Sequence, residues 1–145
     1  MLNDILRLLQ ASSLLHSPQV VELIAYSQNA FRARLRATVT DQLTFQVWLN
    51  HNDRHTRYAY QLFQHGQPIL RWDNAPHHPE QAKNFPHHFH DSLGRLTFST
   101  LSGDPLADLP VVLAEIRSCV AAEIDRLVYA LYGLTPAEIR IVEGG

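Results

Sequence analysis

Arginine alternates with apolar residues from Phe31 to Ala37, and this alternation constrains the fold more than any other feature of the sequence. Successive side chains of a β-strand point to opposite faces, so Arg32, Arg34 and Arg36 share one face and apolar side chains form the other. Strands of this kind are typical of an antiparallel sheet that buries only one of its faces. The segment therefore predicts a sheet with one apolar face and one basic face.

Other segments before residue 105 have the composition of strands, and short polar turns separate them. The strand candidates are 20–26, 43–49, 55–63, 68–72 and 93–101. Apolar residues at helical spacing over 2–10 predict a short helix before the first strand. We expect an antiparallel meander of five to six strands, with a long loop over 73–91.

From Asp108 onward the apolar residues change to steps of three and four, which predicts a long helix over about 109–131. Asp108 is the expected N-cap, and Gly133 the expected glycine at the C-terminal end. Thr135 and Glu138 form a capping-box pattern that opens a short last helix. The predicted class is α+β, a single domain over 1–145 with the sheet and histidine loop in 1–104 and a helical tail in 105–145.

Composition and charge exclude several classes of protein. The chain has 145 residues, of which 46% are hydrophobic and 18% charged, and this excludes a disordered chain. A single cysteine, Cys119, allows no intramolecular disulfide. The first residues include an acid in place of a basic leader, and no apolar run reaches the length of a membrane span, so we expect a cytoplasmic protein without membrane contact. The net charge of −2 gives no general preference for a polyanion.

Histidine is concentrated in the predicted loop, where two Pro-His-His units stand ten residues apart. Histidine transfers protons near neutral pH, so two imidazoles can act as base and acid on an RNA 2′-hydroxyl and its leaving oxygen without any cofactor. Arginines would bind the phosphate backbone. The candidate catalytic residues are His77, His78, His87, His88 and His90, with Asp73 orienting an imidazole; the candidate nucleic-acid-binding residues are Arg32, Arg34, Arg36, Arg57 and Arg71.

These residues also allow other interpretations. His88 and His90 would point to one side of an extended strand and could hold a metal ion with Asp91, or with Asp73 or His77, although the spacing matches no standard zinc motif. The histidines could instead brace the loop through hydrogen bonds. The arginine face could be a solvated strand face or could meet the acidic C-terminal part of the chain. The aromatic residues Tyr58, Tyr60 and Trp72 are more typical of a core than of a base-stacking surface.

Three segments together resemble the TumE family, bacterial toxins paired with a helix-turn-helix antitoxin. These segments are 57–61 (RYAYQ), 69–79 (ILRWDNAPHHP) and 84–90 (NFPHHFH). The resemblance implies a toxin with a cognate helix-turn-helix antitoxin as its partner and RNA cleavage as its expected activity. The sequence departs from the family where Thr44, Gln46 and Trp48 stand at strand positions that tend to be acidic. A non-enzymatic nucleic-acid- or protein-binding module and a metal-binding regulator are the alternatives that use the same loop.

The last part of the chain, from Leu127 to Gly144, is similar to the C-terminal ends of some bacterial restriction–modification polypeptides. We interpret it as a packing or assembly element, because the chain contains no methyltransferase motif. The apolar stripe of the 109–131 helix is a candidate seam for a homodimer.

Overall fold

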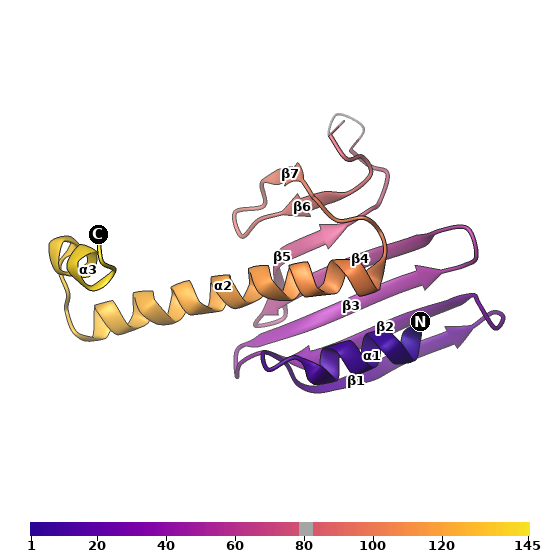
Figure 1. The fold of residues 1–145 in the computed structure, drawn as a ribbon, viewed down its shortest axis with the longest axis horizontal. Coiled ribbons are helices and arrows are strands. Elements are labelled where there is room, and N and C mark those ends of the chain that lie inside the picture. Colours follow the sequence, from indigo (N-terminus) through magenta and orange to yellow (C-terminus); the bar gives the residue numbers. More distant parts are fainter. Residues whose placement is uncertain (79–82) are drawn as a thin grey trace. The chain divides into compact units, whose positions relative to one another are not determined.

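The computed structural model describes residues 1–78 and 83–145, and within them an antiparallel sheet is flanked by helices (Figure 1). The seven strands are β1 (His16–Ala25), β2 (Phe31–Thr38), β3 (Leu43–His51), β4 (Thr56–Gln64), β5 (Gln67–Asp73), β6 (His88–His90) and β7 (Leu96–Phe98). The helices are α1 (Leu2–Ala11), α2 (Pro105–Leu131) and α3 (Pro136–Val142).

The predicted α+β class with an antiparallel meander is confirmed. The strands lie in the sheet in the order in which they follow along the chain, and every neighbouring pair is antiparallel. The sheet has seven strands instead of five to six, because the histidine loop itself contains β6 and is followed by β7. Each of these two strands has only three residues, which is too short for a period-two pattern to be read with certainty from sequence.

The two faces of the sheet differ as the arginine alternation predicts. On β2 the residues Phe31, Ala33, Leu35 and Ala37 are buried, whereas the arginines between them are partly exposed or exposed. The antiparallel register extends the apolar face across β3, β4 and β5, so that Leu49, Tyr58, Tyr60, Leu62 and Trp72 are buried on the same side. The burial of both tyrosines and of Trp72 confirms their interpretation as core residues.

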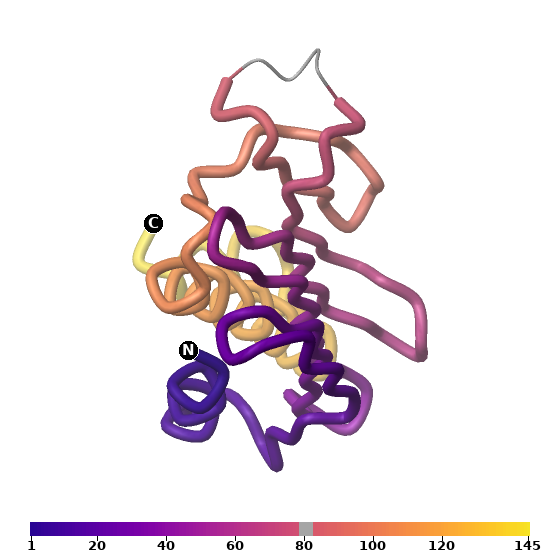
Figure 2. The backbone as a smooth tube through the Cα atoms, turned by 90° about the vertical axis from the view of Figure 1, so that its right-hand side faces the viewer, coloured from indigo at the N-terminus to yellow at the C-terminus, as the bar shows by residue number. Residues whose placement is uncertain are grey.

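Helix α1 and the first turns of α2, up to Val112, lie on the same side of the sheet (Figure 2). Ile5 and Leu9 of α1 and Leu109 and Val112 of α2 are fully or almost fully buried, so these helical segments complete the core on the apolar face. The other face of the sheet is the polar face, defined by the alternate residues that carry Arg32, Arg34 and Arg36 on β2.

Helix α2 begins at Pro105, four residues before the predicted start at Leu109. Pro105 occupies its first turn, and the Asp104 carboxylate accepts a hydrogen bond from the Leu106 amide at 3.1 Å, so Asp104 takes the capping role expected of Asp108. The buried carboxylate of Asp108 instead accepts hydrogen bonds from the amides of Ser102 (2.8 Å) and Gly103 (2.7 Å). Asp108 therefore fixes the segment that leads into the helix.

The chain separates into two compact units, Met1–Val112 and Leu113–Gly145, and the division falls inside α2. In the second unit, Gly133 has a positive φ of 64° after the end of α2, as predicted for a C-terminal glycine. Thr135 and Glu138 form the predicted capping box at α3. A single domain over 1–145, with the sheet and histidine loop in 1–104 and a helical tail in 105–145, stays a prediction. None of the helices in the described part of the chain is both long enough and apolar enough to cross a membrane.

Candidate active site

The pairing of β5 with β6 brings the predicted histidines to the polar face. Trp72 pairs with Phe89, and their rings meet on the apolar side with centroids 4.9 Å apart. This apolar pair sets the register, because a slip of β6 by one residue would turn Phe89 to the polar face and leave Trp72 without its partner. The flanking residues consequently face the polar side in two opposed pairs, Arg71 with His90 and Asp73 with His88.

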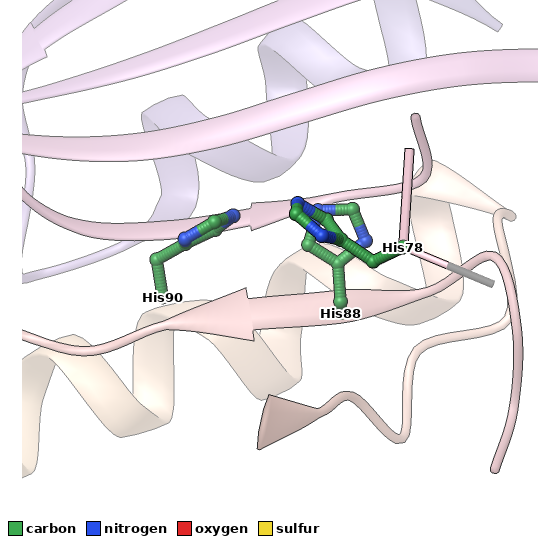
Figure 3. A group of neighbouring side chains, drawn as sticks. All are labelled: His78, His88 and His90. Atoms are coloured by element: carbon green, nitrogen blue, oxygen red, sulfur yellow. The ribbon is translucent and has the colours of Figure 1, made fainter. Parts of the chain in front are cut away.

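His78 joins these four residues from the loop, and the group is called the histidine cluster: Arg71, Asp73, His78, His88 and His90. The ring centroids of His88 lie 5.1 Å from those of both His78 and His90, and the His78 and His90 centroids are 6.0 Å apart. Figure 3 shows the rings of His88 and His90 rising from the same side of β6 and the ring of His78 beside that of His88. The three rings thus converge on one small region.

The carboxylate of Asp73 is the buried centre of the cluster. It accepts hydrogen bonds from Arg71 Nε at 2.6 Å and from the Ala75 amide at 2.9 Å, and its Oδ1 lies 3.1 Å from Nε2 of His88. The side chains of Asp73 and His88 are each only 3% exposed. A carboxylate removed from water needs such partners, so the arrangement fixes the orientation of Asp73.

His88 and His90 differ in accessibility. Nδ1 of His88 lies 2.9 Å from the carbonyl oxygen of Pro86, so both ring nitrogens of this buried imidazole face oxygen atoms. His90 is about one-third exposed, and its Nε2 is 3.9 Å from Asp73 Oδ2. Burial lowers the pKa of the His90 imidazole, which favours its neutral form and leaves a ring nitrogen free to accept a proton or to bind a cation.

The polar face continues from the histidine cluster to the arginine strand. A row of opposed residues runs from Arg71 through Gln61 and Gln46 to Arg36. Arg36 Nε donates to Gln46 at 2.9 Å, and Gln46 Nε2 donates to Gln61 at 3.3 Å. Histidines on β6 and arginines on β2 thus belong to one continuous surface, across four strand spacings or about 19 Å.

A cavity of about 370 Å³ lies on this surface beside the cluster. Arg34, Trp48, Arg57, Arg71 and Asp73 are among the residues that line it. Trp48 and three arginines, Arg34, Arg57 and Arg71, therefore border one cavity on the polar face. A flat aromatic ring among arginines can bind a base together with its phosphates.

Not all predicted site residues lie in the cluster. His87 faces the other side of β6, where its Nδ1 is 2.9 Å from the Tyr58 hydroxyl, and burial lowers the pKa of this imidazole. His77 is exposed and adjoins the cluster only through the chain. Asp91, the predicted metal ligand, instead pairs with Arg95 at 2.6 Å and caps the following turn. His78, from the loop, instead has a ring nitrogen within 4.8 Å of those of His88 and His90.

Two residues of the polar face escaped the sequence analysis. Glu22 of β1 pairs with Arg32 at 3.2 Å and with Arg34 at 3.4 Å, so the acidic partner of these arginines comes from the neighbouring strand. Irregular pairing of β1, with two register shifts, hides this relation in the sequence. Trp48 was noted only for the acid it replaces. Trp48 is two residues from Gln46 on the predicted strand 43–49, so the two side chains share one face, opposite to the apolar residues. This spacing could have identified Trp48 as a residue of the polar face.

The family model of toxin TumE matches residues 5–120, which include α1 from Ile5 onward, the whole sheet, the histidine cluster and α2 as far as Val120. The chain belongs to the TumE toxin family. No curated protein and no solved structure matches it.

Membership of the TumE family assigns this protein as the toxin component of a toxin–antitoxin system, and it implies a cognate antitoxin as partner. The match confirms the family resemblance of the sequence. It ends before residues 127–144, so the similarity of that segment to restriction–modification polypeptides stays a prediction.

Proposed function

We propose that this TumE toxin acts in the cytoplasm on RNA, that the polar face binds the RNA backbone, and that the histidine cluster promotes phosphodiester cleavage. One observation carries the proposal. The β5–β6 register brings two imidazoles, a buried carboxylate and a guanidinium to the face that also holds the arginine strand, and His78 joins them from the loop. Proton transfer and phosphate binding need these groups, and here they share one surface.

The charges of the polar face favour a polyanion. Five arginines belong to it, and the carboxylates that pair with three of them are Glu22 and Asp73. The side chains of Arg32, Arg34 and Arg71 remain about 40% exposed while paired, so their outer nitrogens can still bind a phosphate. Single-stranded RNA suits a flat surface that combines guanidinium groups with a partly exposed indole, that of Trp48.

The proposed reaction is cleavage by the RNA's own 2′-hydroxyl. The 2′-oxygen forms a bond to phosphorus, and its proton passes to an acceptor in the cluster. The bond from phosphorus to the 5′-oxygen breaks, and the leaving oxygen takes a proton. The products are a 2′,3′-cyclic phosphate and a 5′-hydroxyl. Arg71 would stabilise the negative charge that grows on the phosphate oxygens. Cleavage by the histidines alone, as the sequence predicts, would continue in EDTA.

RNA binding at the polar face predicts a large effect of Trp48. Replacing Trp48 by alanine should weaken RNA binding by about 5- to 150-fold, because stacking of one base on an aromatic side chain contributes about 1–3 kcal/mol. Trp48→Phe keeps an aromatic ring and should recover most of the affinity. Fluorescence anisotropy of a labelled single-stranded 2′-O-methyl RNA measures this, since that RNA lacks the attacking hydroxyl. Equal affinities of wild type and Trp48→Ala would contradict binding at this face.

The antitoxin partner is proposed to be of the helix-turn-helix type, as the family resemblance of the sequence implies.

A homodimer through α2 is proposed as well. In the second unit, four exposed apolar residues of α2 follow steps of three and four: Ile124, Leu127, Val128 and Leu131. Such a stripe is typical of a helix that packs against another helix. Leu127→Glu should therefore convert a dimer into a monomer. Ala130→Glu, which adds the same charge on the side of Glu123 and Arg126, should not. Light scattering after gel filtration measures the mass, and a monomeric wild type would contradict the homodimer.

A further inference from the structure

We propose that His78, His88 and His90 form a binding site for one divalent transition-metal ion, with Asp73 as an additional oxygen ligand or as an outer-shell partner. One candidate ligand nitrogen from each histidine lies within 4.8 Å of the other two. Binding itself depends only on this geometry. The catalytic use of the ion rests on the proposed RNA cleavage.

The arrangement of the rings is that of a metal site formed before the ion enters. The planes of the three imidazoles are steeply inclined to one another, by 80° for His78 and His88, 69° for His78 and His90, and 73° for His88 and His90. Stacked rings could not direct their nitrogens to one point, whereas rings at steep angles around a common centre can. Two histidines come from β6 and one from the loop after β5, so the ion would tie that loop to the sheet.

Hydrogen bonds around His88 and Asp73 match the outer shell of a metal site. A metal-bound histidine usually donates its other ring N–H to a carbonyl or carboxylate oxygen. Nδ1 of His88 faces the Pro86 carbonyl at 2.9 Å, which leaves Nε2 for the ion. Arg71 Nε donates a hydrogen bond to Oδ2 of Asp73 at 2.6 Å, and the other carboxylate oxygen, Oδ1, lies 3.1 Å from Nε2 of His88.

The distance between His88 Nε2 and Asp73 Oδ1 is compatible with a shared ion. Two tetrahedral ligands at about 2.0–2.1 Å from zinc lie about 3.3 Å apart. The observed separation of these two atoms is 3.1 Å. An ion beside these two atoms would also lie near His78 and His90, whose candidate ligand nitrogens are within 4.8 Å of that of His88.

The ligand set determines the class of ion. Imidazole is a nitrogen donor that suits Zn²⁺, Ni²⁺, Co²⁺ and Cu²⁺, whereas Mg²⁺ and Ca²⁺ prefer oxygen. Three histidines with one further position fit a catalytic zinc site, in which the remaining position holds water or substrate. In RNA cleavage, a hydroxide on the ion would accept the proton of the 2′-hydroxyl, and the leaving oxygen would take a proton from water.

The test uses the full chain purified without a histidine tag, treated with EDTA and then freed of it. Isothermal titration with ZnCl₂ should show one ion per chain. His78→Ala and His90→Ala should each weaken binding at least as much as loss of an outer-shell partner, about 10- to 100-fold. His55→Ala is the matched control, because His55 lies exposed between β3 and β4, and it should bind zinc as wild type does. Co²⁺ should produce visible absorption bands that His90→Ala removes and His55→Ala keeps.

The outcomes separate the metal site from the proposed function. Zinc binding that is absent in wild type, or equal in all variants, would overturn the metal site even if RNA is cleaved. Zinc binding that depends on His78 and His90 would establish it. If the loaded protein then leaves RNA intact, the site stands and the proposed cleavage fails.

Discussion

Asp73→Ala is expected to lower the free energy of unfolding by about 3–5 kcal/mol. The carboxylate is buried and holds Arg71 Nε, the Ala75 amide and His88 Nε2. Its removal leaves two groups, the buried His88 ring and the part-buried Ala75 amide, without this partner, and each buried polar group left unsatisfied costs about 1–3 kcal/mol. Urea denaturation in EDTA, followed by circular dichroism, measures the difference from wild type.

Asp91→Ala is the matched control for this stability effect. Asp91 also pairs with an arginine at 2.6 Å, but its partner Arg95 is 71% exposed. Exposed pairs contribute little, so together with the lost turn hydrogen bonds we expect a loss of about 1 kcal/mol. Equal losses for the two variants would show that Asp73 is not the buried centre of the cluster.

His90→Ala is expected to abolish growth inhibition by the toxin in bacterial cells. His90 is the most accessible imidazole of β6 and faces Arg71 across the strand pair. If His90 itself transfers a proton, its loss lowers the cleavage rate by about 10²- to 10⁴-fold. If His90 binds a metal ion, its loss removes the ion whose hydroxide would accept the proton. Because His90 is partly exposed, its truncation should leave the fold intact. Growth curves after induction measure the effect at matched protein levels.

His55→Ala is the control for toxicity. His55 lies exposed in the connection between β3 and β4 and takes no part in the histidine cluster. Cells that express this variant should stop growing as they do with the wild type. Full toxicity of His90→Ala would show that the histidine cluster is not responsible for growth inhibition.

The sequence predicts the fold to the extent that its patterns are periodic. The arginine alternation of β2 determines the two faces of the sheet, and the two-residue spacing of His88 and His90 places both imidazoles on one side. The capping box of Thr135 and Glu138 has the predicted geometry. Each of these features depends on residues close together in the chain.

Long-range relations account for what the sequence does not predict. The register of Trp72 with Phe89 decides that Asp73 meets His88, and no local pattern contains that pairing. The same limitation applies to His87, which precedes His88 in the sequence but faces the opposite side of the sheet. There its Nδ1 lies within hydrogen-bond distance of the hydroxyl of Tyr58, which is 29 residues away in the chain. The proximity of His78 depends on the path of the loop between β5 and β6.

RNA cleavage by purified protein tests the central claim most directly. One end-labelled single-stranded RNA is incubated with untagged wild type, His90→Ala and His55→Ala, each with EDTA and with added Zn²⁺. We predict fragments that end in a 2′,3′-cyclic phosphate with wild type and His55→Ala, and none with His90→Ala. The metal site predicts that these fragments need Zn²⁺, whereas cleavage in EDTA would assign the proton transfer to the histidines alone. Intact RNA with folded wild-type protein in both conditions, or equal cleavage by His90→Ala, would contradict the proposed function.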